Sequence, residues 1–251
     1  MSQPRIILFG DSHTYAVQRA LERRVIKSRA LPLAAHRLLK EKNGKHVGDT
    51  SFEDFLNLAR QLGPDDIALS MIGGNQHAVF STIQHPEPFD FADYDGLSEV
   101  RSDAQLIPYR VIHDVFARGI RKGDGKSIES LRKSTRARVV HIIPPPPKRD
   151  NEFIEKHHES LFAKEGITTH GVSQPDLRLK FWRLQTRILE QFCRELGVEV
   201  LMPPAAALDE QGFLAKDFYA NDATHANPEY GELLLTEVER QLLPKQAGAQ
   251  G

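Results

Sequence analysis

Apolar residues follow two different spacings along this chain. Short, nearly continuous apolar runs predict β-strands at Arg5–Phe9, Ile67–Ile72, Arg138–Ile143 and Val198–Met202. Longer stretches, in which apolar residues recur every three or four positions, predict helices at Tyr15–Ile26, Phe52–Leu62, Tyr109–Lys122, Ile128–Thr135, Asn151–Lys164, Asp176–Leu196 and Glu229–Leu243. We also expect a fifth strand within Ala30–Val47. Because strands alternate with helices, the pattern predicts an α/β protein with a parallel sheet covered on both faces.

Two segments do not fit this alternation. Residues 76–108 are rich in Pro, Asp and Phe, and a connection of that length within a compact domain is usually functional or disordered. Pro144–Pro147 is a run of four prolines directly after a predicted strand, and it requires extended backbone there. Neither segment has the character of an interdomain linker. The 251 residues therefore predict a single domain over 1–246, followed by a tail at 247–251 that we expect to be disordered.

Composition and charge exclude several functional classes. A formal net charge of −1 creates no overall field that would attract nucleic acid or an anionic membrane surface. No apolar stretch approaches the roughly 20 residues that span a bilayer, and the first residues lead into a strand without a signal-peptide pattern, so we expect a cytoplasmic protein. The single cysteine, Cys193, excludes an intrachain disulfide and a thiol-based zinc cluster. None of these patterns determines the oligomeric state.

Two short motifs near opposite ends of the chain carry residue types of a hydrolase. Ser12 follows the first predicted strand and precedes a helix, where unpaired backbone amides can stabilise developing negative charge. Asp222 and His225 lie three residues apart just before the last predicted helix. In such a half-turn the carboxylate can accept a hydrogen bond from the imidazole, so that the other ring nitrogen can take the proton of Ser12. The three residues predict a Ser-His-Asp triad.

Further candidates lie at the starts or ends of other predicted elements. Gly48 precedes the second predicted helix, and its amide is a candidate donor to a substrate oxygen; the alternative is a plain turn and helix cap. Asn75 follows a pair of glycines at the end of a strand, and its side-chain amide is either an oxyanion donor or a cap of its own turn. His77 and Phe80 follow closely and are candidates for lining a substrate pocket.

These motifs, in this order, resemble the sequence blocks of the SGNH hydrolase family, also known as GDSL esterases and lipases. The Gly-Asp-Ser block is matched by Gly10–Ser12, the oxyanion glycine by Gly48, the Gly-x-Asn-Asp block by Gly73–Asn75, and the Asp-x-x-His block by Asp222–His225. His13 stands where the family usually has leucine, and Gln76 stands where it usually has aspartate. The resemblance extends from residue 5 to about residue 243.

The resemblance implies a fold, an activity and a set of site residues. The implied fold is a three-layer α/β/α flavodoxin-like sandwich around a mostly five-stranded parallel sheet, which agrees with the periodicity. The implied activity is that of a serine esterase that forms an acyl-enzyme without metal or organic cofactor, with Ser12, Gly48 and Asn75 as the oxyanion hole. We expect a small-molecule or glycan ester substrate. Because the departures at His13 and Gln76 also occur among carbohydrate-directed members, an O-acetyl group on a carbohydrate is the specific hypothesis.

Three alternatives use the same chain differently. An acyltransferase would form the same acyl-enzyme and pass the acyl group to a sugar hydroxyl instead of water. A metal-dependent phosphoesterase would use residues whose order loosely resembles the blocks of calcineurin-like metallophosphoesterases, namely Asp11, His13, Asp49, Asn75 and His77. Gln76 interrupts that pattern, and no Gly-His-x-His segment follows. A binding module without catalysis would not need all three triad residue types.

Overall fold

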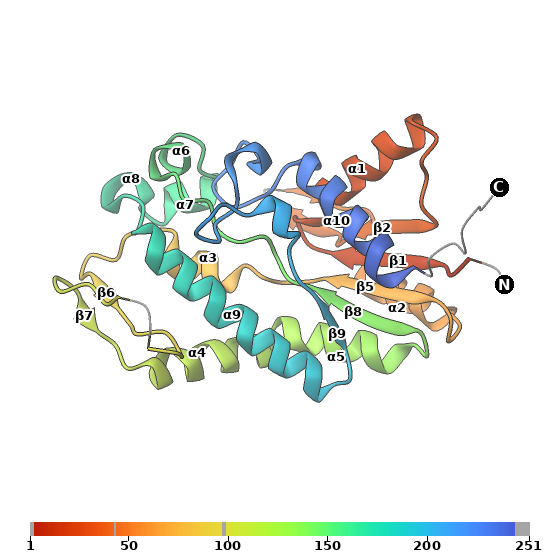
Figure 1. The fold of residues 1–251 in the computed structure, drawn as a ribbon, viewed down its shortest axis with the longest axis horizontal. Helices are drawn as coiled ribbons and strands as arrows, with labels where there is room; N and C mark the ends of the chain where they lie inside the picture. The colour runs from red at the N-terminus through yellow and green to blue at the C-terminus, as the bar shows by residue number, and fades with distance from the viewer. Residues whose placement is uncertain (1–2, 43, 97–98, 244–251) are drawn as a thin grey trace.

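The computed structural model describes residues 3–42, 44–96 and 99–243, so the predicted tail at 247–251 lies outside the described residues. Five strands form a parallel sheet in the order β2 (Leu33–Arg37), β1 (Ile6–Gly10), β5 (Ile67–Met71), β8 (Arg138–Ile142) and β9 (Glu199–Leu201) (Figure 1). This is the strand order of flavodoxin-like, doubly wound sheets. The predicted fold class is therefore confirmed, and β2 is the fifth strand expected within Ala30–Val47.

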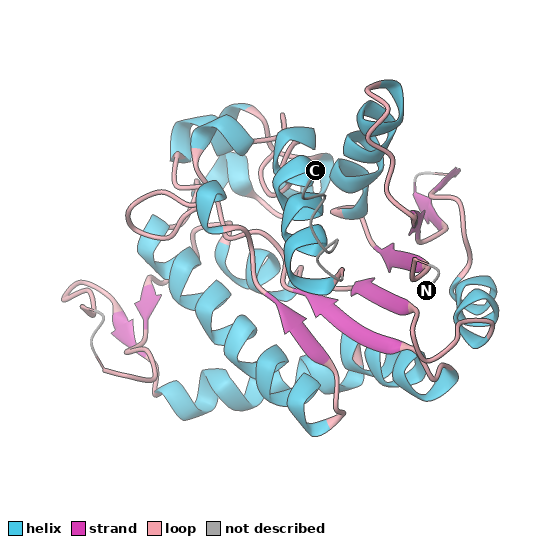
Figure 2. Ribbon diagram, turned by 45° about the vertical axis from the view of Figure 1, so that its right-hand side comes forward, coloured by secondary structure: helices cyan, strands magenta, loops and turns pink. Residues whose placement is uncertain are grey.

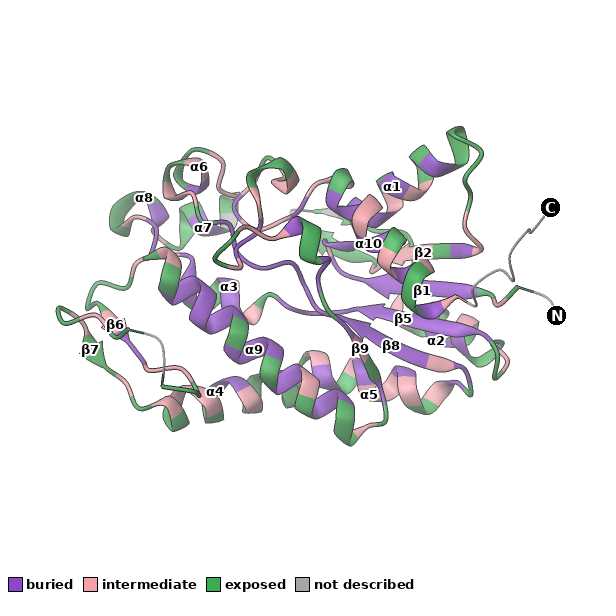
Figure 3. Ribbon diagram, viewed as in Figure 1, coloured by how far each residue is buried: buried purple, intermediate pink, exposed green. Residues whose placement is uncertain are grey.

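Helices cover both faces of the sheet (Figures 1 and 2). In β1, Ile6 and Leu8 pack on one face and Ile7 and Phe9 on the other, because successive side chains of a strand point in opposite directions. The first face carries α1 (Thr14–Ile26) and α10 (Pro228–Leu242); the second carries α2 (Phe52–Arg60), α4 (Tyr109–Lys122), α5 (Asp124–Ser134) and α9 (Pro175–Glu195). Figure 3 shows that the central strands are buried, which explains their continuous apolar runs. Among the helices described, none has the length and apolar character needed to cross a membrane.

The predicted helices agree with the structure except at two places. α5 begins at Asp124 rather than at Ile128, and the helix predicted over Asn151–Lys164 is broken. It consists of α6 (Asn151–Lys156) and α7 (Ser160–Lys164), followed by α8 (Ile167–His170). The imidazole Nδ1 atoms of His157 and His158 form hydrogen bonds with backbone carbonyl oxygens of α6, both at 2.8 Å. Such side-chain bonds compete with the helical ladder, and the break leaves Glu159 in a connection between two helices.

Residues 76–108 form an extension with its own short elements in the residues described. It begins with α3 (Gln76–Ser81) and contains two short parallel strands, β6 (Phe89–Asp90) and β7 (Gln105–Leu106). The buried carboxylate of Asp90 accepts hydrogen bonds from Lys180 Nζ at 2.9 and 3.0 Å and from the amide of Arg101 at 3.0 Å. A buried carboxylate is stable only with such partners. Because Lys180 belongs to α9, this ion pair attaches the extension to the domain.

Two connections leave the carboxyl edge of the sheet side by side. Pro144–Pro147 continues from β8 as buried extended backbone, as its prolines require. The chain that leaves β9 passes through the short 3-10 helices η1 (Ala205–Ala207) and η2 (Lys216–Phe218) on its way to α10. A β-bridge between Lys148 and Leu214 joins the two connections. Segments far apart in the sequence therefore meet at this edge.

The first and last helices lie in direct backbone contact. A Cβ atom on Gly231 of α10 would lie 2.3 Å from the carbonyl oxygen of Ala16 in α1, so the helices can approach this closely only with glycine there. The buried guanidinium of Arg24 adds hydrogen bonds to Glu232 at 2.8 Å and Glu239 at 2.7 Å. Ser12 lies just before α1 and the Asp222–His225 motif just before α10, so this contact fixes the distance between them.

Replacing Gly231 with alanine should lower the free energy of unfolding by about 2 kcal/mol, because the added methyl group overpacks the contact with Ala16. Helix propensity alone would predict the opposite effect, an increase of about 1 kcal/mol in the free energy of unfolding. Gly119→Ala in α4 is the control, since the atoms nearest to a Cβ there belong to the far end of the flexible Gln76 side chain, which can move aside. Chemical denaturation of both variants is the measurement. A Gly231→Ala protein as stable as the wild type would show that the helices are not in tight contact.

Candidate active site

Ser12 lies in the tight turn between β1 and α1. Its neighbour Asp11 holds this turn, because the buried carboxylate accepts a hydrogen bond from the amide of Gly73 at 2.8 Å and forms an ion pair with Lys40 Nζ at 2.5 Å. The amide of Asp11 donates to the carbonyl oxygen of Met71 at 3.3 Å. Asp11 thus ties together the carboxyl ends of β1 and β5, and Ser12 stands at that shared edge with part of its surface exposed.

The imidazole of His225 lies between Ser12 and Asp222. Its Nε2 is 2.6 Å from Ser12 Oγ, and its Nδ1 is 2.9 Å from Asp222 Oδ2. An ionised carboxylate only accepts hydrogen bonds, so Nδ1 carries the hydrogen, and in the neutral ring Nε2 accepts from the hydroxyl. Asp222 is held in turn, since its Oδ1 accepts the amides of Thr224 at 3.0 Å and His225 at 2.7 Å. The fold brings the three predicted triad residues together.

The loop that carries Asp222 and His225 ends in a well-formed helix start. Asn227 caps α10, because its side chain accepts the amide of Tyr230 at 3.1 Å. Its Nδ2 donates to the carbonyl oxygen of Asp217 at 2.7 Å, and Pro228 occupies the first helical position. These local signals, readable in the sequence, orient the loop relative to α10.

Asp222 and His225 each stabilise the charged form of the other. Burial by itself would lower the pKa of His225, but the hydrogen bond with Asp222, followed by the contact with Glu159, raises that pKa to about 9. Burial would raise the pKa of Asp222, but the hydrogen bond with His225 outweighs it and holds that pKa well below its usual range. The carboxylate therefore stays ionised and stabilises an imidazolium at His225.

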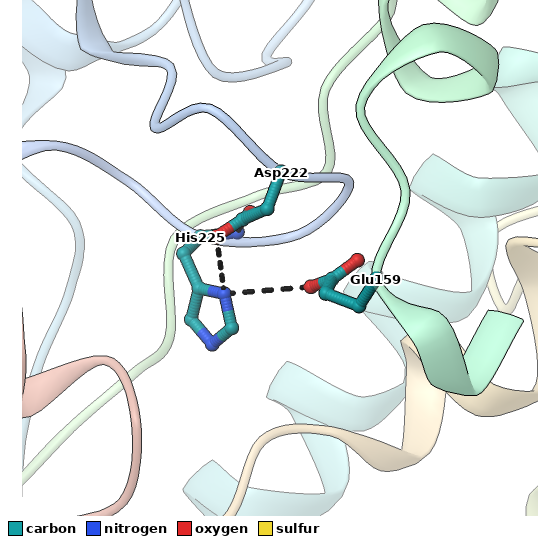
Figure 4. Close-up of side chains that lie close together, drawn as sticks. All are labelled: Glu159, Asp222 and His225. Carbon is teal, nitrogen blue, oxygen red and sulfur yellow. Dashed lines mark hydrogen bonds and ion pairs between the residues drawn. The ribbon is translucent and has the colours of Figure 1, made fainter.

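A second carboxylate, which the sequence did not indicate, also faces His225. Glu159 Oε1 is 3.5 Å from His225 Nδ1, and Figure 4 shows that Asp222 and Glu159 approach this nitrogen from different sides. The same carboxylate accepts hydrogen bonds from the Thr224 hydroxyl at 3.0 Å and the Ala223 amide at 3.2 Å. Glu159 lies in a charged stretch that reads locally as a helix surface, so only the fold reveals this position.

A buried lysine stands behind Asp222. The Nζ atom of Lys148 lies 3.6 Å from Asp222 Oδ1, and it donates hydrogen bonds to the carbonyl oxygen of Ala220 at 2.6 Å and to that of Asp222. It also stands over the rings of Phe153 and Tyr219, 4.9 and 5.0 Å from their centroids, where cation–π attraction offsets lost hydration. Burial lowers the pKa of Lys148 to about 8, although Asp222 and Glu159 oppose this effect.

Glu159, Asp222 and His225 also satisfy the spacing of a metal site, since their ligand atoms all lie within 4.8 Å of one another. Their oxygens, however, already accept hydrogen bonds from three backbone amides and a hydroxyl. The ammonium of Lys148 lies 3.6 Å from Asp222 Oδ1, where it would repel a bound cation. This donor set fits an imidazole held by two carboxylates better than it fits a cation.

The residues expected for a metallophosphoesterase are not gathered into a ligand group in the described part of the chain. Asp49 binds elsewhere, because its carboxylate accepts the side chain of Gln18 at 2.8 Å and the amide of Arg37 at 3.0 Å. His13 and His77 are buried. The geometry therefore does not favour that alternative.

Asn75 is exposed at the start of α3. Its backbone occupies the N-cap position, but its side chain makes no capping hydrogen bond, which argues against the alternative of a plain turn cap. The preceding Gly73 has a φ of 83°, and a Cβ there would lie 2.1 Å from a carboxylate oxygen of Asp124. Only glycine tolerates this turn, which delivers the Asn75 amide to the edge where Ser12 lies.

Two buried histidines lie near this edge. The ring centroid of His13 is 4.9 Å from that of His225, and burial, reinforced by His225 and His77, holds the pKa of His13 well below its usual range. Asn75 acts in the opposite direction and raises the pKa of His13, but its effect is smaller than that of burial. Burial likewise lowers the pKa of His77 to about 4, and its amide donates to Gln185 Oε1 at 2.9 Å. Both rings are therefore neutral, and His77 is 6% exposed, so its predicted role in lining a substrate pocket receives no support from its position.

Phe80 occupies the other end of α3. It is 44% exposed, packs on Phe116 and Phe181 with ring centroids 5.0 and 6.3 Å away, and lines an apolar cleft of about 580 Å³. Among the residues described, the walls of this cleft do not include Ser12, Asp222 or His225. A contact between Phe80 and substrate therefore stays a prediction.

Gly48 follows a small hairpin of β3 (Lys40–Lys42) and β4 (Lys45–Val47) that is inserted after β2. It is exposed, with a φ of 99°, and a Cβ there would lie 2.2 Å from the carbonyl oxygen of Leu38. The amide of Leu38 donates to Gly10 at the end of β1, at 2.9 Å. Gly48 thus lies close to the turn that carries Ser12, and a role of its amide in an oxyanion hole stays a prediction.

No protein-family model matches the chain, and no curated protein matches it in sequence. Solved structures similar to it include a GDSL-like lipase from Bacteroides thetaiotaomicron, with 13% identity, coverage of 96% of this chain and 90% of that chain, and a TM-score of 0.46. A lipolytic G-D-S-L family protein from Veillonella parvula has 13% identity, coverage of 95% and 97%, and a TM-score of 0.48. Phospholipase A1 from Streptomyces albidoflavus has 12% identity, coverage of 94% and 100%, and a TM-score of 0.46. The first two of these proteins are described by the name GDSL, which is also a name of the family that the sequence blocks resemble.

Proposed function

We propose that this protein is a serine esterase that hydrolyses short-chain acyl esters through an acyl-enzyme. The observation that supports this proposal is the unbroken series of contacts from Ser12 Oγ through His225 to Asp222, at 2.6 and 2.9 Å. At these distances His225 can take the hydroxyl proton as the oxygen attacks a carbonyl carbon. Asp222 fixes the tautomer of the ring and stabilises its charged form.

Each step of the proposed reaction uses a group at this edge of the sheet. Ser12 Oγ forms a bond to the ester carbonyl carbon while its proton passes to Nε2 of His225. The amides of Ser12 and Gly48 and the side chain of Asn75 donate hydrogen bonds to the resulting oxyanion. The imidazolium then protonates the alcohol oxygen as its bond to carbon breaks. Water repeats the sequence on the acyl-enzyme, which releases the acid and restores Ser12.

For the substrate we propose a short acyl ester, with an O-acetyl group on a carbohydrate as the specific form. This choice is supported by the sequence resemblance, through His13 and Gln76. In a panel of chromogenic esters from acetyl to palmitoyl, kcat/KM should be highest for acetyl or propionyl esters and should be unaffected by a chelator. A preference for palmitoyl esters would overturn the substrate proposal, and chelator-sensitive activity would favour the metal-dependent alternative.

Ser12→Ala should lower kcat by about 10⁴-fold or more, because within the described part of the chain no other hydroxyl forms a hydrogen bond with His225 Nε2. A fluorophosphonate probe should label the wild type at Ser12 and leave the variant unlabelled. The exposed Ser102 supplies a matched control, and Ser102→Ala should be labelled and active like the wild type. Thermal melts check that folding is retained. A Ser12→Ala protein with nearly normal turnover would remove Ser12 from the reaction.

Asn75→Ala should lower kcat by roughly 10²–10³-fold with a small change in KM, because an oxyanion donor binds the transition state more strongly than the ground state. Asn75→Asp should be at least as harmful, since a carboxylate repels the developing charge. Steady-state kinetics beside a thermal melt separate this role from turn formation. Normal kcat with a lowered melting temperature would mean that Asn75 only shapes the turn.

A further inference from the structure

We propose that Glu159 is a positioning residue that shares the Nδ1–H of His225 with Asp222, so that either carboxylate can hold the imidazole facing Ser12. The inference rests on the proposed function, in which His225 is the base. Glu159 touches no reacting atom, because it faces Nδ1 of the ring (Figure 4), whereas Ser12 Oγ meets the other nitrogen, Nε2. Its effect must therefore pass through His225.

The two acids reach the same nitrogen from different parts of the chain. Asp222 comes from the loop before α10, and Glu159 comes from the connection between α6 and α7. Their nearest oxygens lie 2.9 and 3.5 Å from His225 Nδ1. If Asp222 is removed, a small rotation of the ring is enough to give Glu159 a full hydrogen bond.

Glu159 is fixed in place by the loop that it faces. Its two oxygens accept from the amide of Ala223 and the hydroxyl of Thr224, the two residues between Asp222 and His225. Burial would raise the pKa of Glu159, but the contact with His225 outweighs it and leaves that pKa below its usual range. The carboxylate is therefore charged at neutral pH and does not have to move to meet the ring.

The titratable groups that face His225 come from five segments of the chain. Asp222 and Glu159 are negative, and Lys148 on the connection after β8 is positive, 3.6 Å from Asp222 Oδ1. His13 before α1 lies 4.9 Å away between ring centroids, with His77 of α3 beyond it, and burial keeps both neutral. Below about pH 8, where Lys148 is also charged, two negative charges and one positive charge leave one negative charge, which a protonated His225 balances. Glu159 supplies that excess charge.

This balance sets the pH at which the base can work. A protonated His225 cannot accept the proton of Ser12, so kcat/KM rises as the pH rises through the pKa of His225, about 9. Neutralising Glu159 removes a charge that favours the imidazolium, so the pKa of His225 falls and activity begins at lower pH. A residue that only braced the loop would lower activity at every pH and leave this midpoint in place.

The first experiment compares Glu159→Gln with the wild type by NMR titration of the His225 imidazole and by the pH profile of kcat/KM. Both midpoints should fall by about one pH unit in the variant. The NMR signal, assigned by its loss in His225→Asn, separates His225 from Lys148, whose pKa burial lowers to about 8. Glu152→Gln on α6 is the matched control, because that side chain is 85% exposed, and it should shift neither midpoint. An unchanged His225 midpoint in Glu159→Gln overturns the proposal.

Two further variants distinguish the effect of the Glu159 charge from the effect of its hydrogen bonds to the loop. Glu159→Asp keeps the charge and should keep most of the raised midpoint, which also covers the case in which Glu159→Gln fails to fold. Thr224→Val removes the hydroxyl that donates to Glu159 and that also lies 3.5 Å from His225 Nδ1. Because this hydroxyl carries no charge, the variant should lower stability while leaving the His225 midpoint within about 0.3 units of the wild type. If Thr224→Val and Glu159→Gln shift the midpoint equally, Glu159 only braces the loop.

The second experiment tests the sharing itself with a double-mutant cycle at alkaline pH. Glu159→Gln alone should lower kcat by less than about 10-fold, whereas in an Asp222→Ala background it should lower kcat by a further 10²-fold or so, because no acid then remains on Nδ1. Equal losses in both backgrounds would contradict sharing. If the wild type hydrolysed no ester, the proposed function would fail, and the NMR titration of the same variants would still decide the role of Glu159.

Discussion

Gly231 allows the last helix of the chain to lie against the backbone of the first, and the geometry of the candidate site depends on that contact. The proposed nucleophile and the proposed base belong to turns that precede these two helices, 213 positions apart in the sequence. With a Cβ at Gly231 the helices would have to separate, because it would meet Ala16 O at 2.3 Å. A hydrogen bond of 2.6 Å between Ser12 and His225 tolerates little such displacement.

The parallel sheet supplies the second constraint, because it places the carboxyl ends of all its strands at one edge. β1 leads to Ser12 and β5 to Asn75, and Asp11 joins these two exits through the amide of Gly73. β8 leads through its prolines to Lys148, which binds two carbonyl oxygens of the loop that carries Asp222. The loop before α10 is therefore held in place by the segment that follows β8.

The groups around His225 show how desolvation and pairing are balanced in this fold. Burial disfavours every charge here, and the two isolated histidines, His13 and His77, respond by staying neutral. Asp222, Glu159 and His225 stay charged because each has a close partner of opposite sign or a backbone donor. Lys148 is intermediate, since its partners only partly offset its burial.

Local patterns in the sequence were sufficient to predict most of the secondary structure and to single out the three residues that the fold brings together as the candidate triad. The buried strands β1, β5 and β8 appeared as continuous apolar runs, and Ser12, Asp222 and His225 could be predicted as a triad because each stands at a strand end or a helix start with a characteristic neighbour. β2 had no clear limits because it is an edge strand with only one fully buried residue, Leu33. The break at His157 depends on side chains that bond their own backbone.

Only the tertiary structure decided which groups surround His225. Glu159 and Lys148 lie in stretches whose local pattern fits an ordinary helix surface and a loop, and no spacing relates either of them to His225. Their effects arise from distances of 3.5 and 3.6 Å across elements that are remote in sequence, and from burial that removes the screening by water. Periodicity records which face of an element is buried, but it carries no information about which charged side chains from different elements meet.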